Sequence, residues 1–398
     1  MQRAVYAIAT MDTKADEIEF VAQCLRAAGV EVQTVDVGTA TPPSRLPDIP
    51  RSDILDPDSL PSQADRGESI AAMSRSLTRF LSQRVDAGVV AGVIGIGGSG
   101  GTALITAAMR SMPIGLPKLM VSTVASGNAE PYIDCCDITM MYSVVDVAGL
   151  NVVSHQILSN AAHAMAGMVQ HAAPVRTSQT CLGMTMFGVT TPCVTTVRES
   201  LEEQGFDCLV FHATGTGGRA MENLVRHGMI RGILDITTTE VADEIVGGIF
   251  PAGPDRFDST IRSKLPFVLS VGAIDMVNFG ALQTLPAKFL KRNLHIHNDQ
   301  ITLMRTSVSE NVAIAKWIAQ KLNQSNSAFT FLLPEGGVSM LDAPGAPFHD
   351  PEANRALFET LESELNLDHH RTLIRCPYHI NEPAFAQEIV NAFLTMSE

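Results

Sequence analysis

A glycine-rich stretch in the first half of the chain, "GIGGSGGT" at residues 95–102, has the clearest chemical meaning in the sequence. It follows a run of valine and isoleucine typical of a buried strand, and helical spacing begins directly after it. Glycine lets a bulky anion approach the backbone, and the N–H groups that open a helix attract negative charge. We expect a phosphate or carboxylate here, with tight packing of the turn as the alternative. The candidate contacts are Gly97, Gly98, Ser99, Gly100, Gly101 and Thr102.

A looser glycine stretch, "HATGTGGRA" at residues 212–220, joins a strand-like run to a helix-like run in the second half. Arg219 could supply a fixed cation for an anionic group. We interpret this stretch as the equivalent edge of a related domain, for a second small anionic ligand, and packing is again the alternative. The candidate contacts are Thr214, Gly215, Gly217, Gly218 and Arg219.

The stretch "TMDTK" at residues 10–14 places three polar side chains at the entry of the first expected helix. A helix cap explains Asp12 or Thr13 without a ligand. Lys14 opposes the helix dipole, and a ligand phosphate nearby would compensate it. Asp36 ends the next strand, where dinucleotide folds place a ribose-binding acid, although acids are common at strand ends. The glycine pattern fits neither the dinucleotide fingerprint nor the P-loop.

Other polar residues carry weaker signals. Asp275 and Glu335 follow expected strands, and their oxygens would suit Mg²⁺ or proton transfer. The spacing of Thr237 and Glu240 in "DITTTEVADE" predicts a capping box. His295 and His297 alternate on one strand without a third metal ligand, so ordinary strand histidines are favoured. No recognised catalytic spacing is present, and the catalytic residues and metal ligands stay unassigned.

The elements that must position these residues alternate along the chain as short β-branched runs and helix-length amphipathic stretches. This rhythm predicts parallel sheets covered on both faces, in which ligands bind outside the carboxyl ends of the strands. Because 398 residues exceed one ordinary core, we predict an α/β chain of two Rossmann-like doubly wound domains with mainly parallel sheets facing across a cleft. The nucleotide-binding domain is placed at 1–175 and the second domain at 176–398.

A proline-rich excursion at residues 38–67 interrupts the first domain. Loops of this length are usually lids or interface arms, and disorder is the alternative. Between the domains, the polar stretch "HAAPVRTSQT" is the expected connection.

Charge and cysteine usage narrow the class of partner. The formal net charge of −14 repels nucleic acids and anionic membrane surfaces, so we expect neither as a partner. The seven scattered cysteines have no zinc-ligand spacing and are expected to be free thiols. Neither a signal peptide nor a membrane span is evident, which predicts a cytoplasmic protein.

Several longer stretches carry a family resemblance: "ATMDTK", "GIGGSGGT", "VSTVASGNAEPYI", "HATGTGGRAMENL", "LDITTTEVADEIVGGIFPAGPDR", "GAIDMVNFG", "HNDQITLMRT" and "LLPEGGVSMLDAPGAPFHDPEAN". From about residue 3 to 396 the chain resembles the family of bacterial and fungal proteins built like the amino-terminal inhibitory domain of the tomato mosaic virus resistance protein. The label shared by that family is resistance-protein-like ATP-binding domain.

The resemblance implies two Rossmann-like subdomains, ATP bound with Mg²⁺, and a homo-oligomer. The plant relative continues into a barrel domain, so the resemblance also suggests a separate barrel-domain protein as a partner. Phosphate binding carries over to Gly97 through Thr102 and, less directly, to Asp12 to Lys14 and Gly215 to Arg219. We therefore expect an ATP-binding protein; the alternative is an ATP-dependent kinase, ligase or hydrolase acting on a small anionic metabolite at the interdomain cleft.

Overall fold

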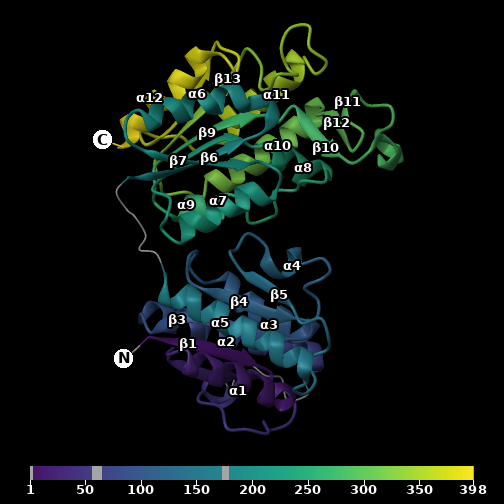
Figure 1. Ribbon diagram of the computed structural model, residues 1–398. Helices are drawn as coiled ribbons and strands as arrows, with labels where there is room; N and C mark the ends of the chain where they lie inside the picture. Colours follow the sequence, from purple (N-terminus) through teal and green to yellow (C-terminus); the bar gives the residue numbers. More distant parts are fainter. Residues whose placement is uncertain (1–2, 56–64, 173–178, 398) are drawn as a thin grey trace. The chain divides into compact units, whose positions relative to one another are not determined.

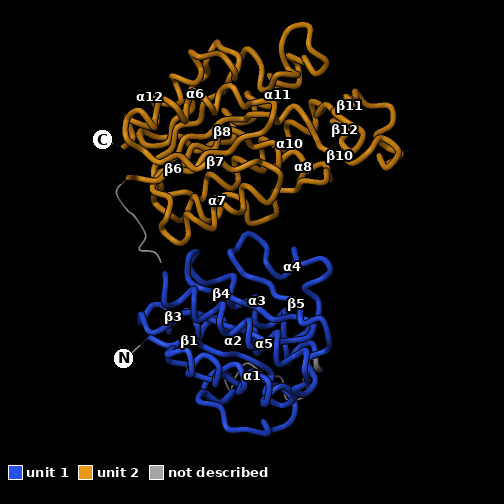
Figure 2. The backbone as a smooth tube through the Cα atoms, viewed as in Figure 1, with its two compact units in different colours: residues 1–175 blue, residues 176–398 orange. Residues whose placement is uncertain are grey.

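The chain forms two compact units, Met1–Val175 and Arg176–Glu398 (Figure 2). The computed structural model describes residues 3–55, 65–172 and 179–397. The predicted domain boundary after residue 175 and most of the expected connection lie outside the described residues, as do positions 56–64 of the predicted loop. Each unit is therefore considered separately.

Unit 1 contains a five-stranded sheet in the order β2-β1-β3-β4-β5, with every pair of neighbouring strands parallel. Strands β1, β3, β4 and β5 are labelled in Figure 1. Its strands are β1 (Ala4–Ala9), β2 (Val32–Asp36), β3 (Val90–Gly97), β4 (Lys118–Ser122) and β5 (Thr139–Tyr142). Its helices are α1 (Met11–Ala27), the 3-10 turn η1 (Arg51–Asp53), α2 (Arg66–Asp86), α3 (Ser99–Arg110), α4 (Glu130–Ile133) and α5 (Val152–Gln170).

Two apolar layers enclose this sheet, because β1 and β3 present buried aliphatic residues on both faces. Helices α1 and α5 pack on one face around Ile18, Val21 and Met165, and helices α2 and α3 pack on the other around Leu77 and Ile105. The continuous apolar runs in the sequence arise from this double covering.

Unit 2 contains a six-stranded parallel sheet in the order β14-β13-β9-β8-β6-β7. Its strands are β6 (Cys181–Met186), β7 (Asp207–His212), β8 (Gly232–Thr237), β9 (Phe267–Gly272), β13 (Phe329–Pro334) and β14 (Arg371–Cys376). The helices are α6 (Thr191–Glu202), α7 (Thr216–Arg226), α8 (Thr239–Val246), α9 (Asp258–Arg262), α10 (Val308–Leu322), α11 (Pro351–Glu364) and α12 (Pro383–Ser397), with 3-10 turns η3 (Gly188–Thr190), η4 (Leu282–Thr284) and η5 (Ala287–Phe289).

Helices also cover both faces of the sheet in unit 2. Helices α6 and α12 pack on one face, and α7 to α11 pack on the other around the aromatic pair Phe267 and Phe329. The first four strands of each unit follow the same spatial order, with the second strand at one side of the first and the third and fourth at the other. The predicted α/β class with two Rossmann-like, mainly parallel domains is confirmed.

A small antiparallel sheet, which the sequence analysis did not predict, is attached to unit 2. It consists of β10 (Met276–Phe279), β11 (Leu294–Asn298) and β12 (Ile301–Arg305) in the order β10-β12-β11. The side chain of Asn298 accepts a hydrogen bond from the Gln300 N–H (2.8 Å) and turns β11 back onto β12. The expected strand "LHIHN" is therefore an edge of this sheet and not of the main one.

The described part of the predicted excursion at residues 38–67 is attached to unit 1 at several points. Ile49 and Ile54 are buried against β2 and α2, and the Ile49 N–H donates to the Thr34 carbonyl (2.9 Å). Asp48 accepts hydrogen bonds from both the N–H (2.8 Å) and the hydroxyl (3.0 Å) of Thr34.

Among the described residues, no helix is long and apolar enough to cross a bilayer.

Candidate functional site

The strand order of unit 1 identifies the edge at which a ligand is expected. Chain connections run to opposite sides of β1, so the loops after β1 and β3 diverge at the carboxyl ends of these neighbouring strands, the place where open α/β sheets usually bind ligands. The stretches at residues 10–14 and 97–102 follow β1 and β3 respectively. The structure therefore places both predicted phosphate-binding stretches of the first domain at the same edge of the sheet.

The glycine loop opens helix α3 with exposed backbone donors. The first intrahelical hydrogen bond runs from the Thr102 N–H to the Gly98 carbonyl (2.8 Å), so the N–H groups of Ser99, Gly100 and Gly101 precede it. Gly98 is the N-cap residue and leaves the cap position without a side chain. Donors of this kind, together with the positive end of the helix dipole, attract anions.

The glycines of this loop differ in what they accommodate. A Cβ on Gly97 would lie 2.8 Å from backbone atoms of Gly101 and Thr102, so Gly97 is required for packing. A Cβ on Gly98 would find the Thr123 hydroxyl at 3.7 Å as its nearest neighbour, and those on Gly100 and Gly101 would find none closer than 3.5 Å. None of the four has a positive φ, so backbone handedness does not account for these glycines.

The two hydroxyl residues of the loop have different surroundings. Ser99 is exposed in the first turn of α3, where its hydroxyl can contact a ligand. Thr102 is fully buried, and its Oγ1 bonds with Ser122 Oγ at the end of β4 (2.7 Å). Thr102 thus fixes the loop to β4 and does not face a ligand, which corrects its expected role as a direct contact.

The loop after β1 is bound to the loop after β2. Asp12 Oδ2 accepts a hydrogen bond from the Ala40 N–H (3.1 Å), and Thr13 is exposed. Asp36 is buried, and its Oδ1 accepts from the N–H groups of Met11 (3.0 Å) and Gly38 (2.7 Å). Asp36 therefore stabilises the start of α1, and this structural role replaces the ribose contact considered from the sequence.

Lys14 has a partner within the protein. Its Nζ donates to the carbonyl of Val147 in the loop after β5 (2.7 Å), and its φ of −134° interrupts the helical geometry of α1. Glu17, one turn later, accepts from the Gly149 N–H (2.6 Å). Because this contact and the kink explain a lysine in the first turn, Lys14 no longer requires a ligand phosphate.

The glycine loop of unit 2 is filled by the protein's own side chains. The Gly215 N–H donates to Glu240 Oε2 (2.9 Å), and a Cβ on Gly218 would overlap the carboxylate of Glu240 and the guanidinium of Arg256. A Cβ on Gly217 would overlap the carbonyl of His212. Packing explains these glycines, and the anion at this loop is an internal carboxylate.

The two glycine loops also occupy different places in their sheets. Residues 97–102 lie at the end of β3, the central strand of the sheet in unit 1, whereas residues 214–219 follow β7, an edge strand of the sheet in unit 2. The looser stretch is therefore not the positional equivalent of the first.

At residues 237–240 the predicted capping box is wrong, because Thr237 Oγ1 bonds with Thr190 Oγ1 (2.8 Å) and Glu240 bonds with Gly215 and Arg256.

Arg256 is the centre of a buried charge cluster in unit 2. Its guanidinium binds Glu240 through Nε (2.5 Å), Glu222 through Nη1 (2.9 Å) and both oxygens of Asp235 through Nη2 (2.8 and 2.7 Å). Burial raises the pKa values of Glu222 and Glu240. These contacts bring together helices α7 and α8 and strand β8, so the cluster organises the fold.

The two acidic residues proposed for metal binding or proton transfer have different environments. Asp275 is buried, and its Oδ2 accepts the Ser339 hydroxyl (2.7 Å). Glu335 is exposed, and its Oε1 accepts from Arg375 Nη1 (3.1 Å). The described residues include no group of three or more histidine, cysteine, aspartate or glutamate side chains arranged to hold a metal, and His295 and His297 thus lack further ligands.

Burial raises the pKa of Asp275 to about 7, with the nearby Asp342 acting in the same direction and Arg305 opposing it. The folded protein therefore keeps a proton that the unfolded chain releases near pH 4. The stability that this proton contributes is complete below that pH and is lost as the pH rises through about 7.

We predict that Asp275→Asn reduces this pH dependence. Between pH 5 and 7 the free energy of unfolding of the unmodified chain should fall, relative to that of the variant, by up to about 1.4 kcal/mol per pH unit. Urea unfolding followed by the fluorescence of Trp317, the single tryptophan of the chain, measures this difference in unit 2. Parallel pH profiles for the two proteins would contradict the assignment.

Two residues that lie beside the glycine loops could not be identified from the sequence. Thr123 lies beside Gly98, and Arg256 lies beside the second glycine loop, but each is distant in sequence from the loop that it contacts. In the sequence, Thr123 and Arg256 stand only within the longer stretches "VSTVASGN" and "FPAGPDR", to which no chemistry could be assigned.

Comparison with protein families matches both units. Residues 3–174 match the model of the "Uncharacterised protein family (UPF0261) N-terminal domain", and residues 179–397 match that of its C-terminal domain. A UPF0261 protein of Rhizobium meliloti (strain 1021) is 50% identical, with 98% of each chain covered. The ToMV resistance protein Tm-1(GCR237) of Solanum lycopersicum is 47% identical over 99% of this chain, which spans 56% of the length of the tomato protein.

Among solved structures, UDP-GlcNAc 2-epimerase from Methanocaldococcus jannaschii is similar over 99% of this chain and 93% of its own. The sequence identity is 8% and the TM-score is 0.22.

Proposed function

The chain belongs to the uncharacterised protein family UPF0261, and we propose its function from the geometry of unit 1: binding of ATP through its phosphates at the start of helix α3. The observation that carries the proposal is the open glycine surface. A Cβ on Gly98, Gly100 or Gly101 would meet no atom closer than 3.5 Å, so these positions leave room beside the first-turn N–H groups, at the sheet edge where the loops after β1 and β3 diverge.

The phosphate chain is the part of ATP that these residues fit best. Backbone N–H groups of Ser99, Gly100 and Gly101 would bind one phosphate group, and the hydroxyls of Ser99 and Thr123 would bind neighbouring oxygens. The overall charge of −14 does not oppose such a site, because backbone dipoles create a local positive field.

Mg²⁺ would accompany the nucleotide. Such ions usually keep several waters and bind through one or two carboxylates together with substrate phosphates. In unit 1 the carboxylate at the carboxyl end of β1 is Asp12, which is partly exposed. The described residues offer no three-carboxylate cage, so we propose that the metal enters as the Mg²⁺–ATP complex.

The proposal assigns the nucleotide to unit 1 rather than to the second glycine loop, where Glu240 already accepts the Gly215 N–H. A homo-oligomer, a separate barrel-domain partner and a cytoplasmic location remain predictions from the sequence. They are independent of the phosphate site.

Calorimetric titration of the nucleotide-stripped chain with ATP tests this function. We expect saturable binding in Mg²⁺ buffer, weaker binding of AMP, and competition by inorganic tripolyphosphate, because the phosphates supply the contacts. A flat ATP titration, or equal affinity for AMP and ATP, would show that the glycines serve another purpose.

A second candidate function is an ATP-dependent kinase, ligase or hydrolase acting on a small anionic metabolite. The observation that favours it is a pocket in unit 2 at the carboxyl ends of β13 and β14, lined in part by Glu335. ATP turnover in a metabolite mixture, measured against a Gly98→Val control, tests this function. Equal turnover by both proteins in every mixture would remove the enzyme hypothesis.

A further inference from the structure

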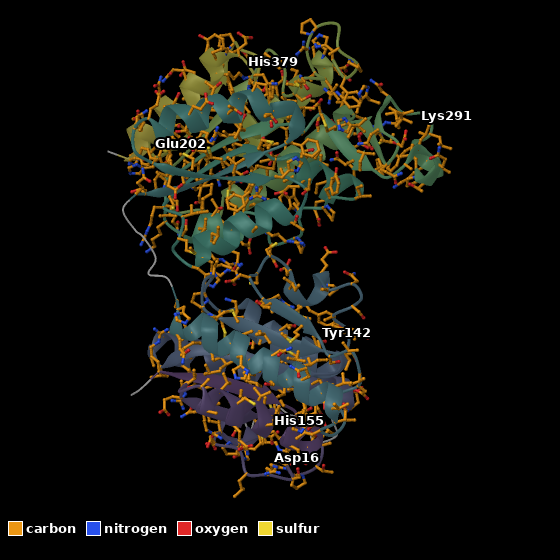
Figure 3. All side chains as sticks on the ribbon, in the orientation of Figure 1. Asp16, Tyr142, His155, Glu202, Lys291 and His379 are labelled. Carbon is orange, nitrogen blue, oxygen red and sulfur yellow. The ribbon has the colours of Figure 1, made fainter. Side chains whose placement is uncertain are left out.

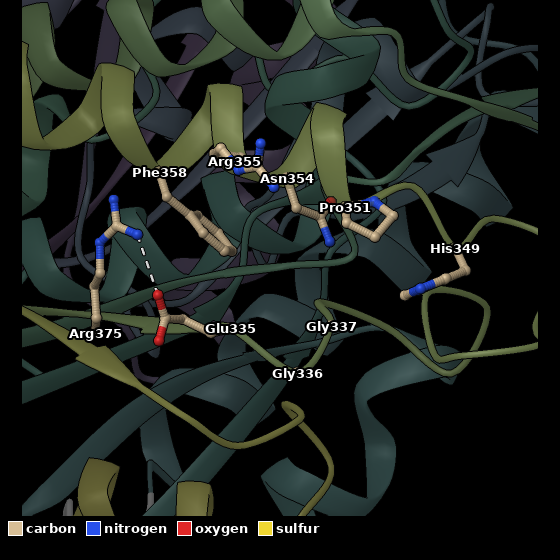
Figure 4. Close-up of a pocket in the computed structure, with 9 residues that line it drawn as sticks. All are labelled: Glu335, Gly336, Gly337, His349, Pro351, Asn354, Arg355, Phe358 and Arg375. Carbon is tan, nitrogen blue, oxygen red and sulfur yellow. Dashed lines mark hydrogen bonds and ion pairs between the residues drawn. The ribbon is translucent and has the colours of Figure 1, made fainter.

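The pocket in unit 2 has the size and location of a small-molecule site. It lies where β13 ends at the glycines Gly336 and Gly337, beside the first turns of helix α11 (Figure 4). Its volume is about 200 Å³, which corresponds to roughly six or seven water molecules. This space suits a small organic acid and is below the range of pockets for larger ligands.

The walls of the pocket carry both charges. Helix α11 contributes Arg355 and the apolar side chain of Phe358, and Glu335 and Arg375 lie together at one end (Figure 4). In the described part of the chain, the exposed Arg355 guanidinium has no hydrogen bond or ion pair, whereas Arg375 is paired with two carboxylates. Arg355 is therefore the cation available to a ligand carboxylate.

Glu335 provides a complementary acceptor. Only its Oε1 is bonded to Arg375 Nη1 (3.1 Å), while Glu362 holds the same guanidinium through Nε (2.9 Å) and Nη2 (2.7 Å). This second pair fixes Arg375 and thereby orients Glu335. A ligand hydroxyl or ammonium group could donate to Glu335 while the ligand's carboxylate binds Arg355.

A buried hydrogen-bond network holds the wall of the pocket that helix α11 contributes. Asn354 of helix α11 donates to Asp342 Oδ2 (2.6 Å) and accepts from Arg305 Nη2 (2.8 Å). On the opposite side, a Cβ on Gly336 would lie 2.5 Å from the backbone N of His379, which is labelled in Figure 3. Walls that are already held in place reduce the conformational entropy that is lost when a ligand binds.

We propose that this pocket binds a small carboxylic acid bearing a hydroxyl or amino group, with Arg355 as the carboxylate contact and Glu335 as the acceptor of the second group. The site lies entirely within unit 2 and does not depend on the nucleotide site proposed in unit 1.

Calorimetric titration of the full chain with malate, aspartate and succinate tests the inference. We expect saturable binding of malate or aspartate at millimolar concentrations and weaker binding of succinate, which lacks the group that donates to Glu335. Arg355→Gln should weaken binding at least about tenfold, because a charge-assisted hydrogen bond is lost. Glu335→Gln should remove the preference over succinate.

Arg198→Gln, at a partly exposed arginine of helix α6 outside the pocket, is the control and should bind as the unmodified chain does. The Gly98→Val variant should also retain acid binding, which separates this site from the nucleotide proposal. The inference is wrong if Arg355→Gln binds the acids as tightly as the unmodified chain, or if none of the three acids shows saturable binding.

Discussion

Replacing Gly98 by valine is expected to weaken Mg²⁺–ATP binding by about 100-fold or more while the fold of unit 1 is retained. A branched side chain at the N-cap would occupy the space beside the first-turn N–H groups of α3. Loss of two hydrogen bonds to a charged phosphate, at about 1.5–3 kcal/mol each, accounts for this factor. Calorimetric titration measures the affinity.

The backbone at Gly98 tolerates the substitution. Its φ of −78° and ψ of −166° lie in the extended region open to all residues, and the Cβ position is clear to 3.7 Å. The N-cap position has no side-chain hydrogen bond to lose, so we expect a stability cost of at most about 1 kcal/mol.

Gly97→Ala is the informative comparison. Its added methyl group meets the backbone of Gly101 and Thr102 at 2.8 Å, so it should destabilise unit 1 by roughly 1–3 kcal/mol through overpacking. Thermal unfolding by circular dichroism distinguishes the two variants. If Gly98→Val unfolds like Gly97→Ala, or binds ATP as the unmodified chain does, the placement of the phosphates is wrong.

The second large effect is expected at Arg256. Arg256→Met should destabilise unit 2 by about 3–5 kcal/mol at pH 7, because it leaves Glu222, Asp235 and Glu240 buried without their common cation. The methionine side chain approximately retains the volume, so the loss of charge dominates. This loss is a large part of the stability of an ordinary domain.

The tryptophan fluorescence of unit 2 provides the measurement. Trp317 of helix α10 packs against Phe257, with ring centroids 6.0 Å apart, directly beside Arg256. Urea unfolding curves at several pH values should show that the deficit of Arg256→Met becomes smaller as the pH falls from 7 to 5. The reason is that the unpaired carboxylates, whose pKa values burial already raises for Glu222 and Glu240, become protonated.

Arg292→Met is the matched control, since Arg292 pairs with the partly exposed Glu310 at the surface of the same unit. We expect a cost of about 1 kcal/mol or less there. A deficit of similar size for both variants, or one that does not depend on pH, would contradict the role assigned to the buried cluster.

The sequence by itself determined the α/β class, the alternation of elements and most of their positions. Amphipathic periodicity at 66–86 and 152–170 is a local property of the chain, and helices α2 and α5 form there. The same holds for the glycine loop at 97–102, whose place between a buried strand and a helix is visible in consecutive residues.

Only the tertiary structure decided how the candidate residues are used. The two glycine loops look alike in sequence, yet Gly215 and Gly218 pack on Glu240, whereas a Cβ on Gly98 or Gly100 would make only ordinary contacts, at 3.5 Å or more. The side chains of Glu240 and Arg256 fill the space beside Gly218, and Arg256 lies 38 residues after that glycine in the sequence. Whether a backbone N–H meets an internal carboxylate or open space depends on contacts between distant segments, and those contacts are set by the packing of helices on the sheet rather than by local spacing.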